Sequence, residues 1–108
     1  MSTKEPRAPR MTPKRAYLKA LKDGPSDKTR KVVCKSPLYA YEYALKVDLG
    51  PHDDTREAAC KDAQNAYEYA RDIDRGFHEK TWETLKGTAY EAGYKEKFGD
   101  CMKENLNQ

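Results

Sequence analysis

Two stretches of the chain share one skeleton at a fixed spacing. The segment CKSPLYAYEYALKVDLG, residues 34–50, is followed 26 positions later by CKDAQNAYEYARDIDRG, residues 60–76. Aligned without a gap, residues 34–59 and 60–85 are identical at twelve of 26 positions. A period of this length is typical of stacked supersecondary units, none of which can bury its apolar face alone. The sequence therefore predicts a repeat protein.

The repeat continues more weakly on both sides of these two units. Downstream, residues 86–108 retain little of the frame, with Ala92 aligned with Ala66, which predicts a degenerate cap. Terminal units of a stack are expected to be atypical because their outer faces meet water. Upstream, residues 8–33 keep the frame. The upstream matches are Tyr17 with Tyr43, Leu21 with Val47, Gly24 with Gly50, Pro25 with Pro51, Asp27 with Asp53 and Thr29 with Thr55.

Each unit is predicted to begin with a helix. Ser36 followed by Pro37 reads as an N-cap with proline at the first helical position, and Asp62 takes the cap position in the next unit. At about 100° per residue, one face collects the apolar side chains and Gly50 ends the helix in the left-handed conformation. The residues expected on that buried face are Ala40, Tyr43, Ala44 and Val47, with Ala66 and Tyr69 in the next unit.

A shorter second helix is predicted after each glycine. Its N-caps are expected at Asp54-Thr55 and Lys80-Thr81, so the period encodes a helical hairpin. No alternating β-branched run is present, and we expect no sheet. The predicted fold is all-α: a short solenoid-like stack of helical hairpins with a 26-residue repeat and a flexible basic N-terminal arm.

Charge divides the chain into a basic beginning and an acidic remainder. Residues 1–35 carry 11 Lys and Arg against three acids, whereas residues 36–108 carry 10 against 15. Three prolines within residues 1–14 argue against a continuous helix there. We therefore expect a flexible arm at 1–14 and a helical-repeat domain at 15–108, with units at about 8–33, 34–59 and 60–85 and the cap at 86–108.

Several classes of protein are excluded by composition. No apolar run approaches the roughly 18 residues that span a bilayer, and the N-terminus lacks the apolar core of a secretory signal. Three cysteines without a CxxC spacing argue against a disulfide framework and a zinc ribbon, and Cys34 and Cys60 are expected to be small buried thiols. We predict a cytoplasmic protein without a membrane partner.

The repeated motif resembles that of a known group of proteins. The order AYEYA, then VDLG, then a glutamate a few residues later is similar to the short Tyr-Ala helical repeats, with a YAxxV core, of small uncharacterised proteins of tailed bacteriophages. The resemblance covers about residues 17–85 and carries no catalytic residue. It implies a phage-encoded accessory protein in the host cytoplasm that binds and modulates a host protein.

Catalysis and cofactor binding find little support in the residues. His52 and His78 occupy equivalent loop positions, each followed by an acid, but one repeat of separation holds them too far apart to share a metal. Cys34 and Cys60 have no glycine-rich elbow beside them, and no phosphate-binding glycine motif occurs. We expect no enzyme activity, no metal and no cofactor; the histidines are expected to cap loops or to face a partner.

Binding of a protein is the favoured function. A stack of repeats presents one long surface from equivalent positions, and tyrosine is a frequent interface anchor. Packing between units is the alternative for these tyrosines, and Trp82 is expected to face the core. The residues predicted to bind a host protein are Tyr41, Tyr67, Glu42, Glu68, His52 and His78.

Nucleic-acid binding through the basic arm is the second hypothesis. Phosphates attract lysine and arginine, but here the tyrosine-rich helices are acidic, which is unusual for a nucleic-acid surface. The oppositely charged parts of the chain also make a homo-oligomer plausible. The residues predicted for nucleic-acid binding are Arg7, Arg10, Lys14, Arg15 and Lys19.

Overall fold

Three side-chain caps fix where the longer helices begin. The computed structural model describes residues 11–106, with side chains up to residue 99. Thr12, Ser36 and Asp62 each accept a hydrogen bond from the backbone N–H three residues later. The caps at Ser36 and Asp62 are those predicted. Because Thr12 caps the first helix, that helix begins at Pro13, two residues before the domain boundary expected from the sequence.

The all-α prediction is confirmed for the described residues, which form seven α-helices and two π-helical segments and no strand. In this part of the chain, four longer helical segments alternate with three shorter helices. The elements are α1 (Pro13–Asp23), α2 (Asp27–Val33), α3 (Pro37–Tyr43), η1 (Ala44–Asp48), α4 (Asp53–Ala59), α5 (Ala63–Tyr69), η2 (Ala70–Asp74), α6 (Glu79–Leu85) and α7 (Glu91–Leu106).

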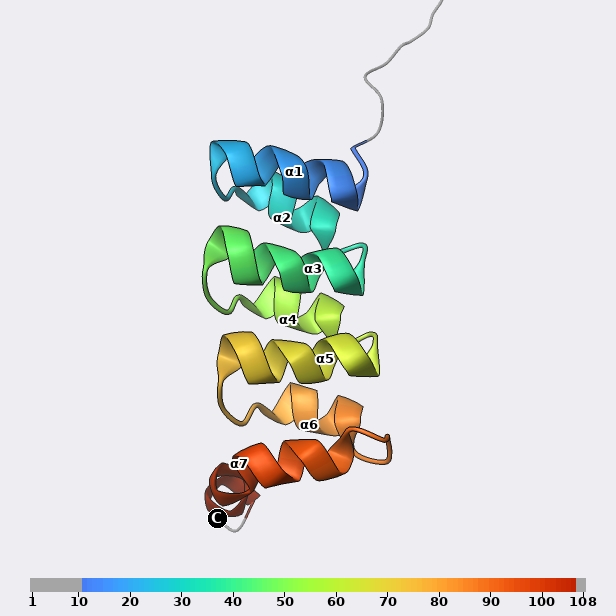
Figure 1. Ribbon diagram of the computed structural model, residues 1–108, viewed down its shortest axis with the longest axis vertical. Helices are drawn as coiled ribbons and strands as arrows, with labels where there is room; N and C mark the ends of the chain where they lie inside the picture. The colour runs from blue at the N-terminus through green and yellow to red at the C-terminus, as the bar shows by residue number, and fades with distance from the viewer. Residues whose placement is uncertain (1–10, 107–108) are drawn as a thin grey trace, which may run out of the picture.

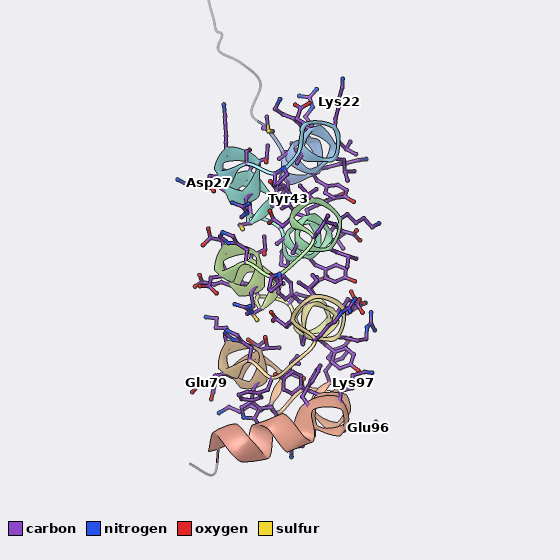
Figure 2. The ribbon with its side chains drawn as sticks, turned by 90° about the vertical axis from the view of Figure 1, so that its left-hand side faces the viewer. Lys22, Asp27, Tyr43, Glu79, Glu96 and Lys97 are labelled. Carbon is purple, nitrogen blue, oxygen red and sulfur yellow. The ribbon has the colours of Figure 1, made fainter. Side chains whose placement is uncertain are left out.

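The helices form two parallel rows. Figure 1 shows α1, α3, α5 and α7 one below another, with α2, α4 and α6 in the spaces between them. Seen along the helix axes, α1, α3 and α5 form one column and α2, α4 and α6 the other, with Tyr43 between the columns (Figure 2). The row of longer helices therefore has an inner face against the short helices and an outer face away from them.

The π-helical turns correct one prediction. Leu49 and Arg75, rather than Gly50 and Gly76, take the left-handed conformation, with φ of 60° and 53°. In a π turn the bond spans five residues, and the N–H of Leu49 reaches back to the carbonyl of Ala44. The wider turn ends on the residue before the glycine, so an ordinary side chain occupies a backbone conformation that usually favours glycine.

The core consists of three apolar clusters, one after another along the rows. The first joins α1, α2, α3 and η1, the second joins α3–η1, α4 and α5–η2, and the third joins α5–η2, α6 and α7. Each cluster contains one fully buried tyrosine: Tyr43, Tyr69 or Tyr94. The core assignment of Tyr43 and Tyr69 is confirmed, and Trp82 is half-buried against the third cluster.

These buried tyrosines also tie the rows together by hydrogen bonds. The Tyr69 hydroxyl accepts from the N–H of His52 at 3.0 Å and donates to its carbonyl at 3.1 Å, or else shares a proton with Thr55 Oγ1 at 2.8 Å. Tyr43 makes the same contacts with Ser26 and Thr29. Each hydroxyl thus holds the first turn of the preceding short helix. Burial of these polar groups is tolerated because they are paired.

A buried ion pair also joins the two rows of helices. Arg56 on α4 forms two hydrogen bonds with Asp74 at the end of η2, at 2.8 and 2.6 Å, and a third with Asp53. The side chain of Asp74 is 7% exposed, whereas that of Asp53 is 94% exposed. Arg30 pairs with Asp48 and Asp27 in the same way. Asp74 and its hydrogen bonds raise the pKa of Arg56, so the guanidinium stays charged.

Removing one tyrosine hydroxyl tests the hydrogen-bonded tie. Tyr69→Phe leaves the His52 N–H without its partner inside the protein, and we expect the free energy of unfolding to fall by about 1–3 kcal/mol. The measurement is urea unfolding followed by circular dichroism. Tyr39→Phe is the control, since that half-buried ring makes no hydroxyl hydrogen bond among the described residues, and it should change stability by less than about 0.5 kcal/mol. Equal losses in both variants would contradict the assigned role.

The two aspartates on Arg56 give a second matched comparison. Asp74→Asn removes the buried countercharge and should cost about 3–5 kcal/mol, because the guanidinium remains charged and covered. Asp53→Asn removes an exposed partner of the same guanidinium and should cost less than about 1 kcal/mol. Thermal unfolding of the two variants measures the difference. Similar melting temperatures would show that burial of the Arg56–Asp74 pair is unimportant for stability.

Candidate functional site

Tyr41 is covered by the next helical segment. Its side chain is 8% exposed, and its hydroxyl donates to Asp72 Oδ2 at 2.5 Å. Asp72 also accepts two hydrogen bonds from Arg71. These bonds from Arg71 lower the pKa of Asp72 to about 2. Burial, followed by the bond to Asp72, raises the pKa of Tyr41 to about 12. The structure therefore places Tyr41 in the seam between α3 and η2, not on an open surface.

Tyr67 occupies the next seam, between α5 and the start of α7. Its ring stacks on Tyr90 with centroids 5.6 Å apart, and the Arg71 guanidinium lies 5.8 Å from its centroid. A Cβ added at Gly93 would lie 3.3 Å from the Tyr67 hydroxyl, so the glycine lets α7 approach closely. With these neighbours, Tyr67 is half-buried.

The two predicted glutamates are half-buried on the outer face. Glu42 pairs with Lys46, whose Nζ lies 3.3 Å from Oε1, but that buried oxygen has no well-formed hydrogen bond. Glu68 accepts from Gln64 Nε2 at 3.2 Å. Both carboxylates therefore have local neighbours of their own, and they lie on the same face of α3 and α5.

His52 and His78 cap the short helices. The Nδ1 atom of His52 accepts from the Asp54 N–H at 3.2 Å, and that of His78 accepts from the Lys80 N–H at 3.3 Å. The N-caps thus lie at the histidines, two residues before the predicted positions, because the tyrosine hydroxyl already holds the histidine backbone. Within residues 11–99, no group of three His, Cys, Asp or Glu is placed to hold a metal.

The basic residues proposed for nucleic acid are divided by the structure. Arg7 and Arg10 lie outside the described residues. Lys14, Arg15 and Lys19 are exposed on α1, where Lys19 pairs with Asp23 at 2.9 Å. In the part of the chain that the structure describes, Lys14 and Arg15 form no ion pair. They leave α1 with a basic exposed side.

The two described cysteines differ in environment. Cys60 is buried as predicted, with its sulfur 3.8 Å from Thr81 Oγ1. Cys34 is half-exposed in an open hollow between α2 and α4, beside Asp54 and Glu57. Burial raises the pKa of the Cys34 thiol to about 11. A thiol of that pKa is protonated at neutral pH and is a weak nucleophile.

Four exposed leucines form a feature that the sequence reasoning missed. Among the described residues, the exposed large apolar side chains are Leu18 (51%), Leu21 (49%), Leu38 (47%) and Leu49 (79%). The ungapped alignment paired Leu21 with the buried Val47. Counted from the caps at Thr12 and Ser36, however, Leu21 corresponds to Leu45, because α1 lacks the extra residues of the next unit. Aligning the caps instead of the glycines would have placed Leu21 outside.

Tyr94 is the second residue that was missed. Its hydroxyl accepts from the His78 N–H at 2.9 Å, as Tyr69 does from His52. It lies 25 positions after Tyr69, so the strict 26-residue frame placed Lys95 there instead. The frame missed the equivalence of Tyr94 with Tyr69 because the chain is one residue shorter between them than the 26-residue frame requires.

The comparisons with known proteins identify no relative. No protein-family model, curated protein or solved structure matches this chain. In the described part of the chain, none of the helices combines the length and the apolar character needed to cross a bilayer.

The shifted pKa values of Asp72 and Tyr41 predict a pH dependence of stability. The folded pKa of Asp72 lies below its unfolded value of about 3.9, so its stabilisation is present above pH 4 and is lost as the pH falls towards 2. The folded pKa of Tyr41 lies above the ordinary value of about 10, so its stabilisation is present below pH 10 and is lost towards pH 12. Urea unfolding across this range should show both losses.

Single variants separate the contributions of Tyr41 and Asp72 from those of the other ionisable groups. In Tyr41→Phe the loss of stability between pH 9 and pH 11.5 should be smaller than in the wild type, and in Asp72→Asn the loss between pH 4 and pH 2 should be smaller. If the unfolding free energy of the variants varies with pH as that of the wild type does, Tyr41 and Asp72 do not cause these losses of stability.

Proposed function

We propose that the protein is a short solenoid-like stack of helical hairpins that acts without catalysis, by binding another protein. Recurrence of the same contacts supports the stack. The Arg30–Asp48 and Arg56–Asp74 pairs lie 26 positions apart, as do the bonds of Tyr43 and Tyr69 to the short helices. A structure held by nearest-neighbour contacts of this kind leaves its outer face free for recognition.

One strip of the outer face carries the proposal. Side chains at the second, sixth and ninth positions after each helix cap share one side of the longer helices. This outer strip is continued by the left-handed residue that ends η1 or η2. Its members are Lys14, Leu18 and Leu21 on α1, Leu38, Glu42, Leu45 and Leu49 on α3–η1, and Gln64, Glu68, Arg71 and Arg75 on α5–η2.

The strip changes character along the stack. All four exposed leucines belong to α1 and α3–η1, whereas the equivalent positions of α5–η2 are polar or charged. Exposed apolar side chains that gather on one face and are rimmed by charges are typical of protein-binding surfaces. This clustering is the observation that supports protein binding best. In line with the resemblance to phage repeats, we propose a protein of the host cell as the partner.

In this proposal Tyr41 and Tyr67, the tyrosines predicted to bind a partner, support the outer strip. Tyr41 and Asp72 fix the spacing of α3 and η2, and the half-buried Tyr67 joins α5 to α7 through its stacking on Tyr90. Nucleic-acid binding remains the second candidate, because Lys14 and Arg15 leave one side of α1 basic and without countercharge among the described residues. Strong dependence on salt would be its signature.

Two leucines on α1 offer a test of the strip. Leu18→Ser combined with Leu21→Ser should leave the melting temperature nearly unchanged, because both side chains are half-exposed. Binding should weaken by at least roughly tenfold, since each apolar contact contributes on the order of 1 kcal/mol. The measurement is capture of proteins from nuclease-treated bacterial lysate, followed by titration with the partner that is identified.

A matched double variant on the other row is the control. Lys28→Ser combined with Lys31→Ser has the same spacing on α2, and both positions are exposed. If the partner binds the leucines, this control should bind as the wild type does. If the control loses binding and the serine variant on α1 keeps it, charge attraction carries the function and the strip does not.

A further inference from the structure

A groove lies where the outer strip meets the ends of η1 and η2. It has a volume of about 450 Å³. Its lining includes Leu45, the exposed Leu49, the buried Ile73 and the exposed Arg75. The complete lining is Ala44, Leu45, Leu49, Gly50, Pro51, Asp72, Ile73 and Arg75.

Leu49 is placed at this groove in an unusual way. It is 79% exposed and has a φ of 60°, although a glycine follows it directly. A leucine in the left-handed region costs free energy that a glycine would not. Exposure of the side chain means that packing inside the protein does not offset this cost. Contact with something outside the chain would explain why an apolar side chain is held here, and π turns such as η1 often occur at functional sites.

The charges around the groove favour an acidic occupant. Asp72 is already satisfied by Arg71 and by the Tyr41 hydroxyl. Arg75 is exposed, and its Nε donates to the Asp72 carbonyl at 3.3 Å. No carboxylate pairs with Arg75 within the described residues. The groove therefore combines apolar side chains with one exposed guanidinium that forms no ion pair among the described residues, and a carboxylate from outside would give it one.

We infer that this groove binds a segment of the partner protein that presents an apolar side chain next to a carboxylate. The apolar side chain packs against Leu45, Leu49 and Ile73, and the carboxylate pairs with Arg75. A lipid surface fits less well, because the site is concave and Asp72 lines it. The inference rests on the proposed function and specifies the chemistry of the partner.

Two synthetic peptides test the charge preference directly. Both are ten-residue, blocked peptides with a central Leu-Leu pair; aspartates flank the pair in one and lysines in the other. The probe is ¹⁵N-labelled full-length protein, observed by NMR during titration. The acidic peptide should shift the amide signals of residues 44–50 and 72–75 in a saturable way, and the basic peptide should bind at least tenfold more weakly. Shifts elsewhere, or equal binding of both peptides, would overturn the inference.

Substitution of the strained residue separates binding from stability. Leu49→Gly removes the apolar wall and relieves the left-handed backbone, so the melting temperature should rise by roughly 2–5 °C while affinity for the acidic peptide falls at least fivefold. Arg75→Gly relieves the same kind of strain but keeps Leu49. The melting temperature of this variant should therefore rise, and its preference for the acidic peptide should be lost. Wild-type affinity in Leu49→Gly would overturn the inference.

Two further outcomes distinguish this inference from the proposed function. If the wild type captures a partner that the Leu18→Ser and Leu21→Ser variant loses but Leu49→Gly keeps, the strip binds the partner and the groove does not. If sedimentation shows a dimer that Leu49→Gly dissociates, the occupant is a second copy and the inference is wrong. Failure of every variant and of the wild type to capture a protein would instead overturn the proposed function.

Discussion

The tyrosine hydroxyl between the two rows is the contact on which the rest of the structure depends. Each short helix has only seven residues, too few for stability alone. Tyr43, Tyr69 and Tyr94 reach from the longer helices to the first turn of the preceding short helix and bind its backbone. A planar side chain lies over each tyrosine ring: Arg30 over Tyr43, Arg56 over Tyr69 and Trp82 over Tyr94. The same side chain thus fills the core and fixes where the next element begins, so a chain with few large aliphatic residues can still form an ordered stack.

Much of the fold could be predicted because its rules are local. Caps at Ser36 and Asp62, burial of Tyr43 and Tyr69, and the absence of strands in the described residues follow from spacing and capping alone. The misplaced elements are those where the residue count changes. A π turn moves the left-handed residue to Leu49, and one residue fewer before α7 moves the tyrosine to Tyr94. An alignment without gaps cannot register either change. The same alignment does match Arg30 with Arg56 and Asp48 with Asp74.

The candidate site was harder to predict because it depends on neighbours distant in sequence. Tyr41 lies on the flank of its own helix, and only the position of Asp72 on the next helical segment decides that it is covered. The exposure of Leu18 and Leu21 likewise depends on which sides of α1 the neighbouring helices cover. Periodicity predicts which side chains share a face. It does not predict which face the neighbouring helices leave open.

Stability and recognition are assigned to different positions of the same helices. The inner positions keep their residue types from one hairpin to the next, as Tyr43 and Tyr69 do, because the hydrogen bonds and ion pairs there need fixed geometry. The outer positions change from leucine on α3–η1 to polar or charged residues on α5–η2, although both segments keep the same order of α-helix and π turn. The contacts of these side chains, such as Glu42–Lys46 and Arg71–Asp72, stay close to the surface, so their residue types can vary more than those of the inner positions. Leu49 and Arg75 differ from the other outer positions, because there the backbone itself is strained while the side chain stays exposed. Such a residue costs the fold free energy and contributes little to its packing, which leaves its side chain available for the contact that we propose outside the chain.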